Sequence, residues 1–200
     1  MVSGTFSVLA ISPNSKLMGV GATSGSSSVG DRVPHAVPGV GVVATQAYTN
    51  AVYGTKGLEL MAKGSPPQEV LDKLLLQDSG KDLRQVAIMD FKGRKAVFTG
   101  TFVPEYCASV IGKDYVMIGN MLSRREVVSS MAEAFENSSG NLVSRIVNAL
   151  KAGSKNGGDR RGEFSAALVI ISGRNVEVKI SVDSHASPVE ELRRKLRTKR

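Results

Sequence analysis

A threonine at the head of a strand-like segment is the first residue in this sequence that could act as a nucleophile. Thr5 follows Gly4 and opens an apolar run that extends to Ile11. A threonine hydroxyl reacts poorly without a base beside it, but a chain that begins with threonine supplies that base from its own α-amine, whose pKa is ordinarily about 8. We therefore interpret residues 1–4 as a leader, which is either a frayed terminus or a cap whose removal at the Gly4–Thr5 bond would expose the amine.

Neutral polar side chains gather where another apolar segment ends. Gln46, Asn50 and Tyr53 lie in the stretch ATQAYTNAVYG at 44–54, directly after a β-branched run that begins at Val40. Amide and phenol groups donate and accept hydrogen bonds without carrying charge, which suits recognition of an amide or a carboxylate. A polar loop that satisfies its own backbone is the other interpretation of this stretch.

A third group of polar residues lies in the segment GGDRRGEFSAAL at 157–168. The glycines allow positive φ or close backbone approach. Arg160 and Arg161 could form a fork onto a substrate carboxylate, or could pair with Asp159. Ser165 is small and opens the strand that follows, as if a ligand must fit against it. A functional site is favoured here over a structural ion pair.

Two further positions complete the candidate set. Asn120, in the GNML segment at 119–122, ends a predicted strand and could donate to a ligand or cap the next helix. Ser24 lies in the glycine-rich stretch Gly19–Gly25. Because no helix follows that stretch, we do not interpret it as a dinucleotide-binding loop, and Ser24 is retained as a candidate ligand contact.

Several kinds of chemistry are disfavoured. Cys107 is the only cysteine, which excludes an intrachain disulfide and a cysteine-rich metal site. His35 and His185 are the only histidines, so neither a structural zinc nor another bound metal is expected. A Ser-His-Asp triad would have to use one of them, and Asp183 with His185 is better interpreted as surface. Phosphate-loop and nucleophile-elbow motifs are absent, and no cofactor is expected.

Length and composition indicate one soluble domain. The chain has 200 residues, of which 42% are hydrophobic and 22% charged. It contains no run of about 18 apolar residues, so a membrane span is not expected. The N-terminus has no basic segment followed by an apolar one, so a cytoplasmic location is expected.

Half of the net charge of +8 lies at the C-terminal end. The stretch 189–200 carries six cations and two anions. Such a segment could contact nucleic acid or a membrane surface, or could be a solvated basic helix. No aromatic residue lies between the cations, so a base-stacking surface is not indicated and nucleic acid is not an expected partner.

The hydrophobic pattern predicts helices in pairs between groups of strands. Such an order disfavours a doubly wound parallel sheet and favours an α+β fold, a four-layer αββα sandwich of mainly antiparallel sheets covered by helix pairs. We expect a single domain at 5–183, followed by a basic tail or helix at 184–200, and Ser65 as a helix cap before Pro66. The predicted strands are 5–11, 17–23, 40–46, 85–90, 95–99, 115–119, 165–171 and 176–182, and the predicted helices are 55–63, 66–77, 124–137 and 141–152.

The sequence resembles the family called domain of unknown function 1028, which is itself similar to the N-terminal nucleophile (Ntn) hydrolases. The resemblance rests on Thr5-Phe6-Ser7, the segment at 44–54 with Gly57-Leu58, Asp82 with Arg84-Gln85-Val86, GNML at 119–122 and GGDRRGEFSAAL at 157–168. It implies the αββα sandwich and places Thr5 in the nucleophile position. Members commonly begin Met-Thr-Phe-Ser, whereas Val2-Ser3-Gly4 intervene here.

These observations together lead to the hypothesis of an Ntn-type amidohydrolase for a small amide-containing substrate. Thr5 would be the nucleophile and, through its amine, the base. Backbone N–H groups with Asn120 would stabilise the oxyanion, and Asp159 would orient the nucleophile. The expected substrate contacts are Ser24, Gln46, Asn50, Tyr53, Arg160, Arg161 and Ser165. A non-catalytic module that binds a small ligand or a partner in the same crevice is the alternative, and a homo-oligomer, by default a homodimer, is expected in either case.

Overall fold

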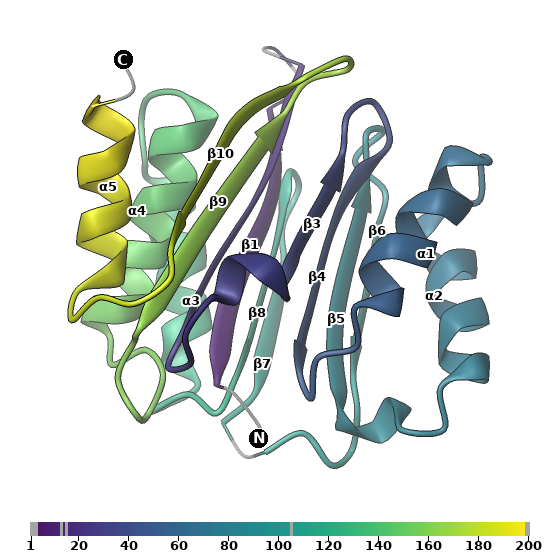
Figure 1. Cartoon of the computed structure of the whole chain (residues 1–200), viewed down its shortest axis with the longest axis horizontal. Coiled ribbons are helices and arrows are strands. Elements are labelled where there is room, and N and C mark those ends of the chain that lie inside the picture. Colours follow the sequence, from purple (N-terminus) through teal and green to yellow (C-terminus); the bar gives the residue numbers. More distant parts are fainter. Residues whose placement is uncertain (1–3, 13, 15, 105, 199–200) are drawn as a thin grey trace.

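Two antiparallel sheets form the centre of the protein (Figure 1). The computed structural model describes residues 4–12, 14, 16–104 and 106–198. The larger sheet has the strand order β10-β9-β2-β1-β8-β7, and the smaller has the order β3-β4-β5-β6. The strands are β1 (Thr5–Ser12), β2 (Leu17–Ser24), β3 (Pro34–Val37), β4 (Gly41–Ala47), β5 (Arg84–Asp90), β6 (Lys95–Thr99), β7 (Ala108–Ile111), β8 (Tyr115–Asn120), β9 (Ser165–Ile171) and β10 (Val176–Val182).

Helices cover the outer face of each sheet, as Figure 1 shows at its left and right sides. The smaller sheet is covered by α1 (Val52–Ala62) and α2 (Pro67–Gln77), and the larger by α3 (Glu126–Glu136), α4 (Leu142–Lys155) and α5 (Pro188–Thr198). Short 3₁₀ turns lie at Val29–Asp31 and Lys81–Leu83. The predicted four-layer αββα sandwich is therefore confirmed.

Strand alternation on β1 divides its side chains between two apolar cores. Phe6 and Val8 point toward the helices of the larger sheet, and Leu9 and Ile11 point toward the smaller sheet. A strand that is buried on both faces has a nearly continuous apolar sequence, and this pattern is the reason that β1 could be predicted. The same alternation directs the side chain of Thr5 into the space between the two sheets.

The sequence missed two strands, and both lie at sheet edges. β3 is absent from the predicted strands, because proline disfavours a strand, but Pro34 is the first residue of an edge strand, where proline's missing N–H is tolerated. The four-residue β7 is the edge strand of the larger sheet, and Ser109 and Ile111 on it are exposed. Short, half-exposed strands lack the buried run on which strand prediction depends.

The helix ends differ from the prediction by at most three residues, and the largest differences are at the start of α1 and the end of α4. Ser65 does not cap α2, because Pro66 is the residue that precedes the helix and Pro67 is its first residue. The helix predicted at 141–152 extends further, since α4 continues to Lys155. A Cβ on Gly153 would lie 2.8 Å from the ring of Phe6, so this glycine allows the helix to pack closely on β1.

The predicted C-terminal tail contains the packed helix α5. Val189 and Leu192 are buried against the core of the larger sheet, and Leu196 is half-buried. Residues 1–3 of the predicted leader and 199–200 of the tail lie outside the described residues. Among the helices of the described part, none is both long enough and apolar enough to cross a membrane.

If α5 belongs to the folding domain, Leu192→Ala should destabilise the protein by about 2–4 kcal/mol, because the substitution leaves a cavity in the core. Leu76→Ala is the matched control, since Leu76 is 83% exposed and its loss should change stability by less than about 0.5 kcal/mol. Chemical denaturation of both variants measures the difference. Equal stabilities would mean that α5 is dispensable for the fold.

Candidate active site

A row of buried polar residues crosses the larger sheet at the end of the sandwich where the N-terminus lies (Figure 1). Strand register pairs Ser165 with Ser24, Ser24 with Thr5, and Thr5 with Asn120. All four side chains are fully buried. Because buried polar groups need hydrogen-bond partners, this row marks the place where the apolar interior gives way to a polar site.

The hydroxyl of Thr5 belongs to a chain of hydrogen bonds that ends on the preceding peptide group. Thr5 Oγ1 donates to Ser24 Oγ over 3.1 Å, and Ser24 Oγ donates to the carbonyl oxygen of Gly4 over 2.6 Å. The N–H of Ser26 donates to Ser24 Oγ over 3.2 Å. Ser24 therefore connects the candidate nucleophile to the carbonyl of the Gly4–Thr5 bond.

The side chain of Gln46 joins the two sheets beneath this row. Its Oε1 accepts from Ser7 Oγ over 2.6 Å, and its Nε2 donates to the carbonyl of Thr5 over 2.9 Å. Nε2 also lies 2.8 Å from Gln85 Oε1 and 3.1 Å from Asn120 Oδ1. Gln46 thus fixes the backbone of Thr5 from the facing sheet.

Ser7 and Gln85 are part of the network but were not among the predicted site residues. Each is a polar residue inside an otherwise apolar strand, and both are fully buried. A polar residue that interrupts a run of apolar residues is the sequence signal from which Ser7 and Gln85 could have been predicted. Nothing in the sequence indicates that the two strands face one another.

Asp159 is held rigidly beside the Gly4–Thr5 bond and is almost fully buried. Its Oδ2 accepts from the N–H of Gly25 over 2.8 Å, and its Oδ1 accepts from the N–H of Arg161 over 3.0 Å. The Arg161 guanidinium donates to both carboxylate oxygens, over 3.1 and 2.9 Å. Hydrogen bonding to Asp159 raises the pKa of Arg161 above its ordinary value.

Two glycines make room for this ion pair. A Cβ on Gly4 would lie 2.4 Å from Asp159 Oδ2, and a Cβ on Gly25 would lie 2.6 Å from the same oxygen. The Gly25 Cβ would also lie 2.9 Å from Arg161 Nη2. The carboxylate therefore lies against both glycine backbones, and neither position admits a side chain unless Asp159 moves.

Ser165 and Arg160 take different positions around the cluster. Ser165 Oγ donates to the carbonyl of Ser26 and accepts from the N–H of Val29, so it holds the loop that follows β2. Arg160 is exposed, while its backbone N–H donates to the carbonyl of Met121. Of these two side chains, only that of Arg160 is exposed at the surface.

Asn50 and Tyr53 belong to a second cluster, centred on Asp78. Its Oδ2 accepts from Tyr53 Oη over 3.1 Å, from Asn50 Nδ2 over 3.4 Å and from Arg84 Nε over 2.9 Å. Hydrogen bonding to Arg84 lowers the pKa of Asp78 to about 2, and burial raises that of Tyr53. The structure does not link either of these predicted site residues to Thr5.

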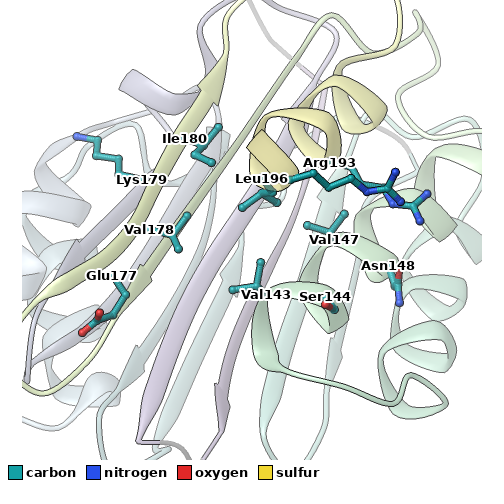
Figure 2. A pocket seen from close by; sticks show the side chains of 11 residues that line it. Val143, Ser144, Val147, Asn148, Glu177, Val178, Lys179, Ile180, Arg193 and Leu196 are labelled. Atoms are coloured by element: carbon teal, nitrogen blue, oxygen red, sulfur yellow. The ribbon is translucent and has the colours of Figure 1, made fainter. Parts of the chain in front are cut away.

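Thr5 is enclosed in the intact chain. Two hollows stand out in the described part, one of about 530 Å³ between α4, α5 and β10 (Figure 2) and one of about 420 Å³ beside His35 and α1. Thr5 lines neither of them. Because Thr5 is fully buried, a substrate could reach its hydroxyl only after the residues that cover it move or are removed. The same part of the chain also contains no group of three His, Cys, Asp or Glu side chains placed to hold a metal.

Comparisons with known proteins extend over nearly the whole chain. The model of the Family of unknown function (DUF1028) matches residues 5–192. The crystal structure of protein SPO2555 from Silicibacter pomeroyi, described by the same family model, is similar with a TM-score of 0.91 and 31% identity, over 98% of this chain and 88% of that chain. Anbu (ancestral beta-subunit) from Yersinia bercovieri gives a TM-score of 0.47 and 9% identity, over 98% and 94%. No curated protein matches the sequence.

The Asp78–Arg84 ion pair should give stability a pH dependence. Because the pKa of Asp78 falls from 3.8 to about 2 on folding, its contribution is complete above the unfolded value and is lost as the pH falls through the folded value. Asp78→Asn should therefore be less stable than wild type near neutral pH, and the difference should shrink between about pH 4 and pH 2. Urea denaturation across this range measures it, with Asp72→Asn as the exposed control. A difference that stays constant down to the lowest pH would contradict the assignment.

Proposed function

This chain belongs to the Family of unknown function (DUF1028), and from that premise we propose that it is an amidohydrolase of the N-terminal nucleophile type. Thr5 attacks the carbonyl carbon of a small amide substrate. The observation that carries the proposal is the hydrogen-bonded path from Thr5 Oγ1 through Ser24 Oγ to the Gly4 carbonyl. This path connects a hydroxyl, a proton relay and a peptide carbonyl at one buried point.

The first reaction is cleavage of the chain's own Gly4–Thr5 bond. Thr5 Oγ1 bonds to the carbonyl carbon of Gly4, and its proton passes through Ser24 to the carbonyl oxygen. The tetrahedral intermediate collapses by breaking the carbon–nitrogen bond, and the proton moves to the departing nitrogen. An ester between Gly4 and Thr5 Oγ1 remains, and water hydrolyses it to release a chain ending at Gly4 and restore the hydroxyl.

The new α-amine of Thr5 then acts as the general base for substrate. It takes the hydroxyl proton directly or through water and returns it to the leaving amine. The Gln46 bond to the Thr5 carbonyl survives cleavage, because that carbonyl lies on the retained side. Ser24 Oγ, which donates to the Gly4 carbonyl before cleavage, and Asn120, which pairs with Thr5 in the strand register, are the proposed oxyanion donors.

The leader also indicates which acyl groups the site accepts. The ester formed during self-cleavage is itself an acyl-enzyme whose acyl carbon belongs to glycine. A substituent on the Gly4 Cα would meet the Asp159 carboxylate at 2.4 to 2.8 Å, and that carboxylate is fixed by Arg161 and Gly25. The proposed substrates are therefore amides of acyl groups without a branch at the α-carbon, such as acetyl or glycyl amides.

The alternative is a non-catalytic binding module on the same fold. It is favoured by the complete burial of Thr5 while Gly4 precedes it. In that state the Thr5 nitrogen is an amide and cannot serve as a base. The state of the Gly4–Thr5 bond therefore distinguishes the two functions, because the hydrolase requires it to be cleaved and the binding module does not.

Self-cleavage predicts a change in intact mass. Protein purified from its native host should have lost residues 1–4, Thr5→Ala should remain uncut, and Ser24→Ala should be cut about 100-fold more slowly, since it loses the hydroxyl that passes the Thr5 proton to the Gly4 carbonyl oxygen. Ser26→Ala is the matched control, because only the backbone of Ser26 contacts Ser24. If wild-type protein still contains Gly4, the hypothesis that Thr5 is an amine-assisted nucleophile is wrong, and the binding module becomes the favoured function.

Substrate size can be tested on a chain that begins at Thr5, prepared by removing a fusion partner with a protease. Acetyl and glycyl p-nitroanilides should be hydrolysed, and the alanyl compound should have a kcat/KM at least about 10-fold lower, because its methyl group meets Asp159. Thr5→Ala should abolish turnover, and the exposed-site variant Arg160→Ala measures any contribution of that guanidinium. Equal rates for all three compounds would disprove the proposed limit on acyl size but not the hydrolase function. If none of the compounds is hydrolysed, the result would contradict the proposed hydrolase function itself.

A further inference from the structure

A groove of about 530 Å³ lies between α4, α5 and the edge strand β10, away from Thr5 (Figure 2). In the register of the larger sheet, the Val178 region of β10 is next to Ile170, which pairs with Gly19 of β2. That end of the strands is opposite to the Ser24 end, where Thr5 lies. The groove is therefore separate from the candidate active site.

Aliphatic side chains form the interior of the groove. Figure 2 shows them converging from all three elements. Three of them, Val143, Val178 and Leu196, are only half-buried although they pack against the main core. Exposed aliphatic surface gathered in a concave site is typical of a binding groove rather than of ordinary protein surface. The aliphatic residues are Val143, Val147, Val178, Ile180 and Leu196.

The charged groups on the α5 side of the groove are cationic. Arg193 and Arg197 are one helical turn apart on α5 and both line the groove. Arg193 has a long 3.7 Å contact with Glu190, and Arg197 forms no ion pair with any described residue. Both guanidinium groups can therefore accept an anion without breaking a strong ion pair.

The other two charged residues of the lining point elsewhere. Lys179 alternates along β10 with Val178 and Ile180, so its side chain lies on the opposite face of the strand, whereas Glu177 lies where the strand pairing is irregular, between Val176 and Val178. Figure 2 shows both directed away from the aliphatic cluster. They do not neutralise the arginines within the groove.

Polar groups of α4 complete the rim beside the arginines. Ser144 lies in the first turn of that helix, where the helix dipole favours an anion, and Asn148 follows one turn later. In Figure 2, Arg193 extends toward Asn148. The groove thus has an aliphatic interior and one polar, cationic side.

We propose that this groove binds a long-chain carboxylate, with the chain along the aliphatic residues and the carboxylate on Arg193 and Arg197. The planar guanidinium matches a carboxylate with paired hydrogen bonds. The volume falls within the usual range of small-molecule pockets, about 300–1,000 Å³. A second copy of the chain is a poor occupant, because each copy carries a net charge of +8 and would bring its own arginines to the contact.

Carboxyl-13C-labelled dodecanoate, below its micelle concentration, is the probe, and NMR of the full chain detects its binding. Binding should be saturable with one site per chain. Arg193→Gln with Arg197→Gln should weaken it at least about 10-fold, since it loses charge-assisted hydrogen bonds, and Val178→Phe should block it by filling the groove. Lys56→Gln, which removes an exposed cation of α1 outside the groove, should bind as wild type.

Four results would overturn the proposal. The first is the absence of saturable dodecanoate binding. The second is that dodecanol binds with the same affinity as dodecanoate and the double arginine variant has no effect on either. This result would mean that the groove is an apolar hollow without a carboxylate site. The third is binding to phosphatidylglycerol vesicles without binding of free dodecanoate, and the fourth is a concentration-dependent dimer that Val178→Phe disrupts while dodecanoate does not bind.

Discussion

The buried carboxamide of Gln46 is the interaction on which the arrangement of the site depends. It is the point where β4 of the smaller sheet is hydrogen-bonded to β1 of the larger sheet, through Ser7 and the carbonyl of Thr5. Apolar packing between sheets resists sliding only weakly, because one aliphatic contact can replace another. A buried amide is different, since each lost partner costs about 1–3 kcal/mol. Gln46 therefore fixes one register of sheet on sheet and, with it, the position of Thr5.

Charge is excluded from that interior and kept at the rim. The network around Gln46 consists of neutral amides and hydroxyls. The carboxylates of Asp159 and Asp78 lie in loops, where Asp159 pairs with Arg161 of the same loop and Asp78 pairs with Arg84 at the start of β5. Burying a charge between the sheets would be costly, but at the rim each pair also accepts backbone N–H groups. The two pairs thus hold the loops in place at the same end of the sandwich that carries Thr5.

The sequence predicted the layers well because they rest on local signals, namely buried apolar runs and helical periodicity. Of the predicted site residues, Thr5, Ser24 and Asn120 are neighbours in the structure, because each lies at a strand end and the strand register brings these ends together. Contacts between the sheets could not be predicted from the sequence, because no local pattern shows that Gln46 faces Ser7. For the same reason Asn50, close to Gln46 in the chain, could not be assigned to the Asp78 cluster. Tertiary pairing across about 30 residues of chain is not encoded in any short motif.

The ion pair beside the leader has a consequence for the amine that cleavage would create. Gly4 lies against the Asp159 carboxylate, so a new N-terminus at Thr5 would form close to a negative charge. An unpaired carboxylate there would stabilise the protonated amine, raise its pKa and weaken it as a base. Because Arg161 binds both oxygens of Asp159, the pair presents little net charge to its surroundings. In the proposed hydrolase, the arginine would let the Asp159 carboxylate limit the size of the acyl group without raising the pKa of the Thr5 amine, a role of the Asp159–Arg161 pair beyond holding the loop.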